Sequence, residues 1–286
     1  VTAARLIAID GATTVNVTAT AVTTISGAAA DLNTVLTAGG ITGLGAEAVT
    51  VTDSAVTAAV LNTLNGNTTG LVTATGVTAI TGTIAQINTL VGNEGDSGDK
   101  VNLDTDYTAT ITDTDIAASV LNTLNSNVPG LVTATSVTNI TGTAAAINTL
   151  MGNEGDSGNK VNLDTDFTVT VDAGSVAAAH LNTINAKTTG LVTATAATTI
   201  TGTAAAINTL IGNEGNSGDK VNLDSDFLVT IASGSVSAAH LNTINAATTG
   251  LVTATAVTAL TGTAAVINTL VGNEGDSGDK VNLDTD

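Results

Sequence analysis

Residues 70–129 decide the fold, and they read GLVTATGVTAITGTIAQINTLVGNEGDSGDKVNLDTDYTATITDTDIAASVLNTLNSNVP. Nearly the same text returns from Gly130, from Gly190 and from Gly250, so the chain repeats with a period of 60 residues. A fixed period of this kind is typical of stacked repeats, in which each unit buries its apolar face only against its neighbours. The sequence therefore predicts a repeat solenoid.

The repeats cover almost the whole chain. A divergent short repeat occupies 15–69, and its middle loop is shorter than in the other copies. Full repeats occupy 70–129, 130–189 and 190–249, and a partial repeat occupies 250–286. We expect a single elongated solenoid over 1–286 without a separate globular domain.

Each repeat divides into two related halves of about 30 residues. In the first half, Val and Thr alternate over 71–75 and 77–81, which predicts two strands. The segment 84–91 carries apolar residues at helical spacing, and Gly92 ends it. The fold class predicted for each half is thus α/β: strand, strand and short helix, stacked into parallel sheets.

The second half follows the same plan with different boundaries. Strands are expected at 101–103 and 107–112. Asp113 or Thr114 is the expected N-cap of a helix, and Ile116 is expected on the apolar stripe of that helix.

The composition excludes several function classes. Lys and Arg total 6 against 25 Asp and Glu, and the formal net charge is −19, so the chain repels nucleic acid and anionic membranes. Aromatic residues make up only 1%, so the core must be thin and aliphatic. The chain has no Cys, hence no disulfide framework, and no apolar run long enough to span a bilayer.

The segment 92–106, GNEGDSGDKVNLDTD, is the most polar part of the repeat and recurs at 152–166, 212–226 and 272–286. Its carboxylates in a Gly-rich loop suit Ca²⁺, which takes six to eight oxygen ligands. The spacing is not that of an EF-hand. The alternative is a solvated acidic loop neutralised by Lys100. The candidate Ca²⁺ ligands are Glu94, Asp96, Asp99, Asp104, Asp106, Glu154, Asp156, Asp164, Asp166, Glu214, Asp219, Asp224, Asp226, Glu274, Asp276, Asp279, Asp284 and Asp286.

Two further patterns allow two interpretations each. Thr-x-Thr recurs in the strands, and stacked pairs would form a hydroxyl ladder like that of ice-binding solenoids, or simply an exposed β-branched strand face. An Asn recurs in the helices, where it predicts either an amide ladder between neighbouring coils or a residue tolerated near a helix end. The threonine pairs are 18/20, 73/75, 133/135, 193/195 and 253/255, and the asparagines are Asn88, Asn122, Asn148, Asn182, Asn208, Asn242 and Asn268.

No catalytic motif is evident. His180 and His240, one period apart, replace Val60 and Val120. A metal pair is conceivable, but surface or helix-flank histidines are the preferred interpretation. No Ser-His-Asp, Cys-His or phosphate-loop arrangement is present. We therefore expect a non-enzyme, because near-identical repeats offer the same surface several times.

The segments LNTLNGNTTGLVTATGVTAITGTIAQINTL and ITDTDIAASVLNTLN resemble the Thr/Ala/Asn-rich repeats of very long bacterial exoproteins, such as surface-layer, adhesin and filament-forming proteins. The resemblance covers nearly the whole chain and implies an extracellular or cell-surface setting. It implies no specific activity.

These observations favour a structural protein: a segment of an extracellular filament, surface layer or matrix fibre. The alternatives are an adhesin stalk or an ice-binding solenoid with Ca²⁺-stiffened repeats, and a β-helical polysaccharide lyase comes third. The segment following Asp106 in earlier copies has no counterpart after Asp286. We therefore expect an open end that self-associates, head to tail or laterally, into fibres.

Overall fold

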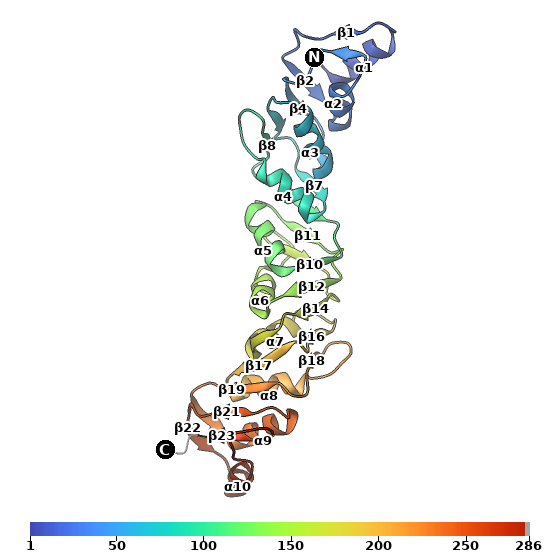
Figure 1. Ribbon diagram of the computed structural model, residues 1–286. Helices are drawn as coiled ribbons and strands as arrows, with labels where there is room; N and C mark the ends of the chain where they lie inside the picture. The colour runs from blue at the N-terminus through green and yellow to red at the C-terminus, as the bar shows by residue number, and fades with distance from the viewer. Residues whose placement is uncertain (284–286) are drawn as a thin grey trace. The chain divides into compact units, whose positions relative to one another are not determined.

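The chain folds as an α/β repeat solenoid of strand–strand–helix coils, as the sequence predicts (Figure 1). The computed structural model describes residues 1–283. Within this range it has ten helices, and every strand pair in its sheets is parallel. The chain divides into two units, one formed by Val1–Asp113, Thr123–Ser136 and Glu154–Leu163, the other by Thr114–Asn122, Val137–Asn153 and the chain from Asp164 onward.

The helices are short, with one in each coil. Their bounds are α1 Ala3–Gly11, α2 Ala29–Leu36, α3 Ala58–Asn67, α4 Ile84–Gly92, α5 Ala118–Asn127, α6 Ala144–Asn153, α7 Ala178–Asn185, α8 Ala204–Gly212, α9 Ala238–Ala247 and α10 Ala264–Gly272.

The strands are shorter still, with two or three in each full coil. In the N-terminal part they are β1 Val17–Thr18, β2 Thr24–Gly27, β3 Ile41–Thr42, β4 Ala48–Val51, β5 Ala55–Thr57, β6 Val72–Ala74, β7 Ala79–Gly82, β8 Val101–Leu103, β9 Thr108–Ile111, β10 Asp115–Ala117, β11 Val132–Ala134 and β12 Asn139–Gly142. They continue with β13 Val161–Leu163, β14 Thr168–Val171, β15 Gly174–Ala177, β16 Val192–Ala194, β17 Ala197–Gly202, β18 Val221–Leu223, β19 Leu228–Ile231, β20 Gly234–Ser237, β21 Val252–Ala254, β22 Val257–Thr261 and β23 Val281–Leu283.

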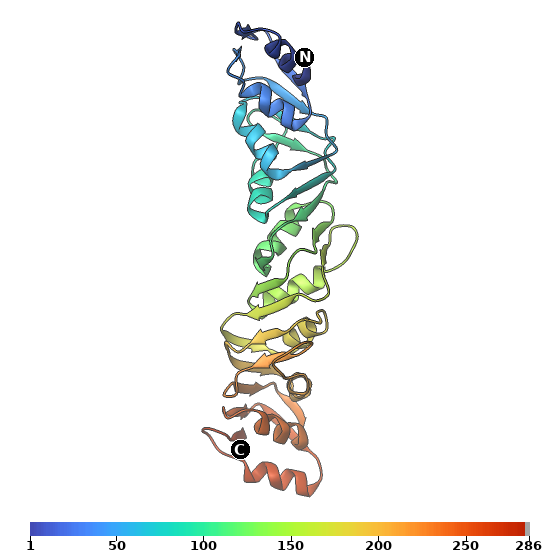
Figure 2. The same ribbon diagram turned by 90° about the vertical axis from the view of Figure 1, so that its right-hand side faces the viewer.

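In the first unit the sheets have the orders β1-β3, β2-β4-β6-β8 and β5-β7-β9-β11-β13. Helices α1 to α4 pack one against the next along the coils (Figure 1). The second unit has sheets β10-β12-β14-β16-β18, β15-β17-β19-β21-β23 and β20-β22. Its helices α6 to α10 pack in the same way, and those coloured orange to red are seen in succession in Figure 2.

The second half of each full repeat differs from the prediction. Ile116 lies in strand β10, and helix α5 begins only at Ala118, so the expected helix start at Asp113 or Thr114 is wrong. The reason is tertiary: Asp115–Ala117 pairs with Asn139–Thr141 on the next coil, which overrides the local capping pattern. This half therefore has three strands instead of two. The additional strand (β5, β10, β15 or β20) begins a new sheet in each repeat.

The core is thin and aliphatic, as the composition predicts. Helix and strand residues such as Leu61, Val72 and Ile87 are completely buried. The few aromatic side chains, Tyr107 and Phe167 among them, are also buried and directly precede strands β9 and β14. Each coil thus buries its apolar residues between its own strands and helix and those of the neighbouring coils.

The glycine that opens each repeat is required by a close approach between coils. A Cβ atom added to Gly190 would lie 2.3 Å from the carbonyl oxygen of Phe167, and one on Gly250 would lie 2.4 Å from that of Phe227. The Thr188 hydroxyl donates a hydrogen bond to the same Phe167 oxygen and accepts one from the Gly190 N–H at 3.0 Å. The repeat start is thereby fixed against the preceding coil.

The predicted amide ladder exists in one half of each repeat. The side-chain Nδ2 of Asn182 donates to the carbonyl oxygen of Ala206 at 2.9 Å, and that of Asn242 donates to Val266 at 3.1 Å. Asn122 and Asn62 make the same bond to the following helix, each at 2.9 Å. In the other half, Asn33 of the divergent repeat makes this bond to the Val60 carbonyl at 3.2 Å. Among the described residues, the first-half asparagines of the later repeats, represented by Asn208, show no such bond to a neighbouring coil.

Replacing Gly190 with Ala is expected to destabilise the protein by roughly 1–3 kcal/mol, because the new methyl group would overlap the Phe167 carbonyl and force the coils apart. Urea unfolding monitored by circular dichroism measures the change. Gly212→Ala is the matched control, since nothing lies within 4 Å of a Cβ there. Equal stability of the two variants would contradict the close-approach argument.

Replacing Asn182 with Ala is expected to cost about 0.5–1.5 kcal/mol, because one hydrogen bond between two packed helices is lost. Asn208→Ala in the following helix is the control and should have a smaller effect. Thermal unfolding of the two variants side by side makes the comparison, and a larger loss for Asn208→Ala would refute the ladder.

Candidate functional site

The acidic loops, the four segments 92–106, 152–166, 212–226 and 272–286, share one backbone design as far as residue 283. In the first loop the N–H of Val101 donates to the carbonyl of Asn93 at 3.0 Å, and the N–H of Gly95 donates to the carbonyl of Val101 at 3.1 Å. Glu94 and Val101 thus form an isolated parallel bridge that closes the base of the loop. The same bridge recurs at Glu154, Glu214 and Glu274.

The tip of each loop turns at a glycine. Gly98 has a φ of +64°, a conformation that favours glycine over other residues. Lys100 is half-buried, and its alkyl stem lies across Gly95, where an added Cβ would come within 3.0 Å of the Lys100 Cγ. The lysine therefore packs on the loop and brings a positive charge among its carboxylates.

Most of the predicted Ca²⁺ ligands are exposed to solvent. Asp104 and Glu154 are half-buried. Asp284 and Asp286 lie outside the described residues. The exposed ligands are Glu94, Asp96, Asp99, Asp106, Asp156, Asp164, Asp166, Glu214, Asp219, Asp224, Asp226, Glu274, Asp276 and Asp279.

The loops bring few of these carboxylates together. Over residues 1–283 no three Asp, Glu or His side chains are grouped as a metal site would require. Some oxygens already serve the turn itself: Asp164 Oδ1 accepts a hydrogen bond from the Thr165 N–H at 2.7 Å, and Asp224 does the same with Ser225. A Ca²⁺ ion in a loop would therefore need backbone carbonyls and water to complete its coordination.

The threonine pairs are separated by a turn. Thr73 lies in strand β6, whereas Thr75 lies in the turn that follows, and the other four pairs divide in the same way. A continuous ladder instead forms from threonines of successive coils: Thr57 pairs with Thr81, Thr81 with Thr110, and Thr110 with Thr133. This five-stranded sheet thus carries one row of outward-facing threonine hydroxyls.

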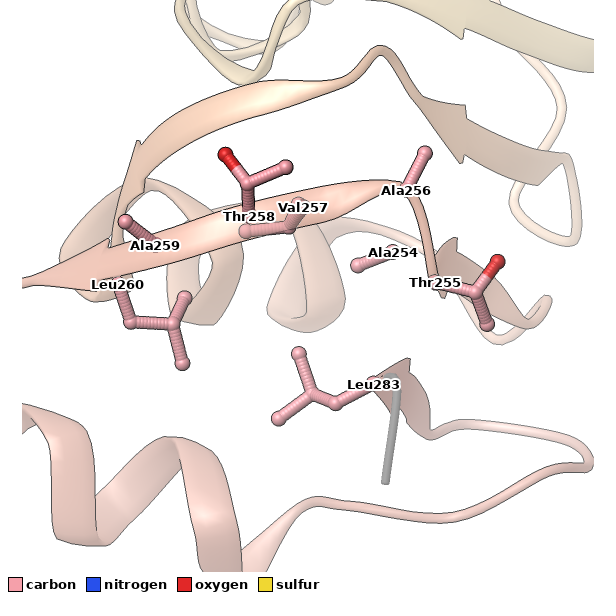
Figure 3. A pocket seen from close by; sticks show the side chains of 8 residues that line it. All are labelled: Ala254, Thr255, Ala256, Val257, Thr258, Ala259, Leu260 and Leu283. Carbon is pink, nitrogen blue, oxygen red and sulfur yellow. The ribbon is translucent and has the colours of Figure 1, made fainter. Parts of the chain in front are cut away.

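Apolar side chains of the last two described strands line a cavity. Strand β22 is paired only with β20 within residues 1–283, whereas the equivalent β17 is paired on both sides. Leu260 of β22 and Leu283 of β23 point into a common cavity of about 560 Å³ (Figure 3). Leu260 is half-buried, whereas its counterpart Ile200 is fully buried under the next strand.

Tyr107 is a residue whose chemistry the sequence did not reveal. Its side chain is buried, and its hydroxyl is buried without a hydrogen-bond partner among the described residues. Burial, with a smaller contribution from the nearby Glu94 charge, raises the pKa of Tyr107 to about 12. Comparing the repeats could have indicated this hydroxyl, since Phe167 and Phe227 occupy the equivalent positions.

Comparisons with protein families, with curated proteins and with solved structures found no match to this chain. In the described part of the chain, no helix combines the length and the apolar character that crossing a bilayer requires.

Replacing Tyr107 with Phe is expected to stabilise the protein by about 1–3 kcal/mol, because it removes a buried hydroxyl that has no partner. In the wild type, the unfolded tyrosine ionises near pH 10 but the folded one only near pH 12. Stability should therefore fall as the pH rises from about 10 to about 12, and Tyr107→Phe should lose less. Tyr107 is the only tyrosine, so absorbance titration reports its ionisation directly.

The predicted Ca²⁺ in the acidic loops is tested by thermal unfolding with Ca²⁺ and with a chelator. A bound ion stabilises the folded state by mass action, so chelation should lower the melting temperature. Asp104→Asn and Asp106→Asn should reduce this difference. An unchanged melting temperature in chelator would support the solvated-loop interpretation.

Proposed function

We propose that this protein is a structural repeat segment of a bacterial extracellular filament, surface layer or matrix fibre. The observation that carries the proposal is the stacking itself: strands such as β12 and β17 each pair in parallel with a strand of the preceding coil and a strand of the following coil. Like units can therefore be added to the stack by the same hydrogen bonds that join the existing coils.

The repeat design supports building over catalysis. Successive full repeats present nearly the same residues, and each adds another copy of the acidic loop. Such a surface suits a fibre that grows by addition of like units, either as further coils of one chain or as second copies stacked head to tail. The net charge of −19 disfavours nucleic acid and anionic membranes as partners. The adhesin-stalk and ice-binding alternatives stay predictions.

Electron microscopy and sedimentation of the purified chain test the proposal. Concentrated protein should form fibres or chains of stacked copies. Leu260→Lys, which places a charge on strand β22, should weaken this association without a large change in melting temperature. Leu228→Lys is the control, because Leu228 is an exposed leucine (46%) on β19, which is paired on both sides.

A wild-type chain that stays monomeric at high concentration, with no fibres in native material, would overturn the proposal. Denaturing electrophoresis of native fibres then separates the two ways of joining coils. A band near 27.7 kDa indicates non-covalent stacking, and a much larger band indicates repeats that continue in one polypeptide.

A further inference from the structure

Two helices of the first unit begin at a carboxylate supplied by the following coil. The Oδ2 atom of Asp53 accepts a hydrogen bond from the N–H of Ala29, the first residue of α2, at 2.7 Å. Asp113 Oδ2 accepts one from the N–H of Ile84, the first residue of α4, also at 2.7 Å. An anion at this place is stabilised by the otherwise unpaired N–H groups and by the helix dipole.

The two later repeats lack this carboxylate. The residues equivalent to Asp53 and Asp113 are Ala173 and Ser233. At both places the structure has a cavity instead, of about 310 Å³ beside Ala173 and about 220 Å³ beside Ser233. Each cavity reaches the first residue of the helix that the aspartate would have capped, Ala144 of α6 or Ala204 of α8.

The cavity beside Ser233, which we call the His240 pocket, is lined by donors from two helix N-termini. The start of α8 contributes Thr203 and Ala204, and the start of α9 contributes Ser237 and the half-buried His240. The strand β20 between them adds the Ser235 hydroxyl. His240 stands where the carboxylate-capped repeats have Val60 and Val120. The repeat that lacks the capping carboxylate thus has an imidazole and hydroxyl groups at the same place, and these groups can bind a carboxylate from outside the chain.

The backbone changes at the same place. Gly234 has a φ of +129°, and the pairing of β20 with β22 shifts in register between Gly234 and Ser235. The aspartate repeats have Ser54 and Thr114 at the position of Gly234. The altered loop accompanies the cavity in both later repeats, since Gly174 has a φ of +130° and the same shift.

We propose that the His240 pocket binds the carboxylate group of a small organic acid, with a carboxylate oxygen at the place that Asp53 and Asp113 occupy in the earlier repeats. The Ala204 N–H, the serine hydroxyls and the His240 imidazole are the donors. The His180 pocket beside Ala173 is the weaker site, because its lining includes Asp172, whose negative charge repels the ligand. In the His240 pocket the position of Asp172 is occupied by Ala232, which carries no charge.

Proton NMR of the two histidine side chains tests the proposal, with acetate as the probe. The chain has only two histidines, and His180→Val and His240→Val assign their signals with a residue that earlier repeats carry at this position. Acetate replaces chloride at constant pH and ionic strength. The His240 signal should shift and saturate, and the His180 signal should shift only at higher acetate concentration.

Two reciprocal variants make the test specific. Ala232→Asp gives the His240 pocket the charge of the other pocket and should weaken acetate binding there by about tenfold. Asp172→Ala should strengthen binding at His180 by a similar factor. Both changes exchange residues between repeats of the same chain, so unfolding is not expected, and circular dichroism verifies this.

A third variant fills the pocket from within. Ser233→Asp restores a carboxylate at the position of Asp113 and should abolish the acetate-dependent shift of His240 while raising the melting temperature. The proposal is overturned if the His240 signal of the wild type does not move, or if both histidine signals move linearly and equally with acetate in the wild type and in Ala232→Asp. The latter result would indicate a general effect of the salt.

Discussion

Hydrogen bonding between parallel strands of successive coils is the constraint on which the rest of this structure depends. Paired strands lie about 4.8 Å apart, so every coil must fit into a narrow rise. Helices in contact usually need roughly 8–10 Å between their axes. Small residues permit close contact between the start of each helix and the next coil. Ala58, Ala118, Ala178 and Ala238 open their helices fully buried, and asparagines rather than large apolar side chains bond one helix to the next.

The same constraint explains the glycine that begins each repeat. At Gly190 the chain passes so close to the Phe167 carbonyl that a β-carbon does not fit, and the Thr188 hydroxyl bonds the same oxygen. In the second repeat Val128 replaces this threonine, and the Gly130 N–H bonds the Tyr107 carbonyl directly at 3.1 Å. The close approach is kept although the side chain that supports it differs. Backbone geometry, more than any one side-chain bond, is therefore what the repeat preserves.

Near-identical repeats make their differences informative. Where two coils have the same backbone arrangement, the residues at equivalent positions can be compared within one molecule. Tyr107 against Phe167 reveals a hydroxyl that the core does not need. Asp113 against Ser233 reveals a place for a carboxylate that two coils supply themselves and two leave as a cavity. A structural role for the stack as a whole is thus compatible with binding at individual coils.

The sequence by itself determined the period, the parallel strand–strand–helix plan, the thin aliphatic core and the position of the acidic loops, because these follow from periodicity and composition. It also predicted that an asparagine joins neighbouring coils, although only three of the seven predicted asparagines do so. Local patterns failed where the partner lies a full coil away. The sequence predicts that Asp113 caps the helix that follows it, but Asp113 caps α4 in the preceding coil. Ile116 was expected in a helix, but it lies in a strand because it pairs with Ile140 of the next coil. The third strand of each repeat, the threonine rows that cross coils and the two histidine pockets were decided by the tertiary structure alone. Each arises from contacts between residues more than twenty positions apart, which only the stacking of coils brings together.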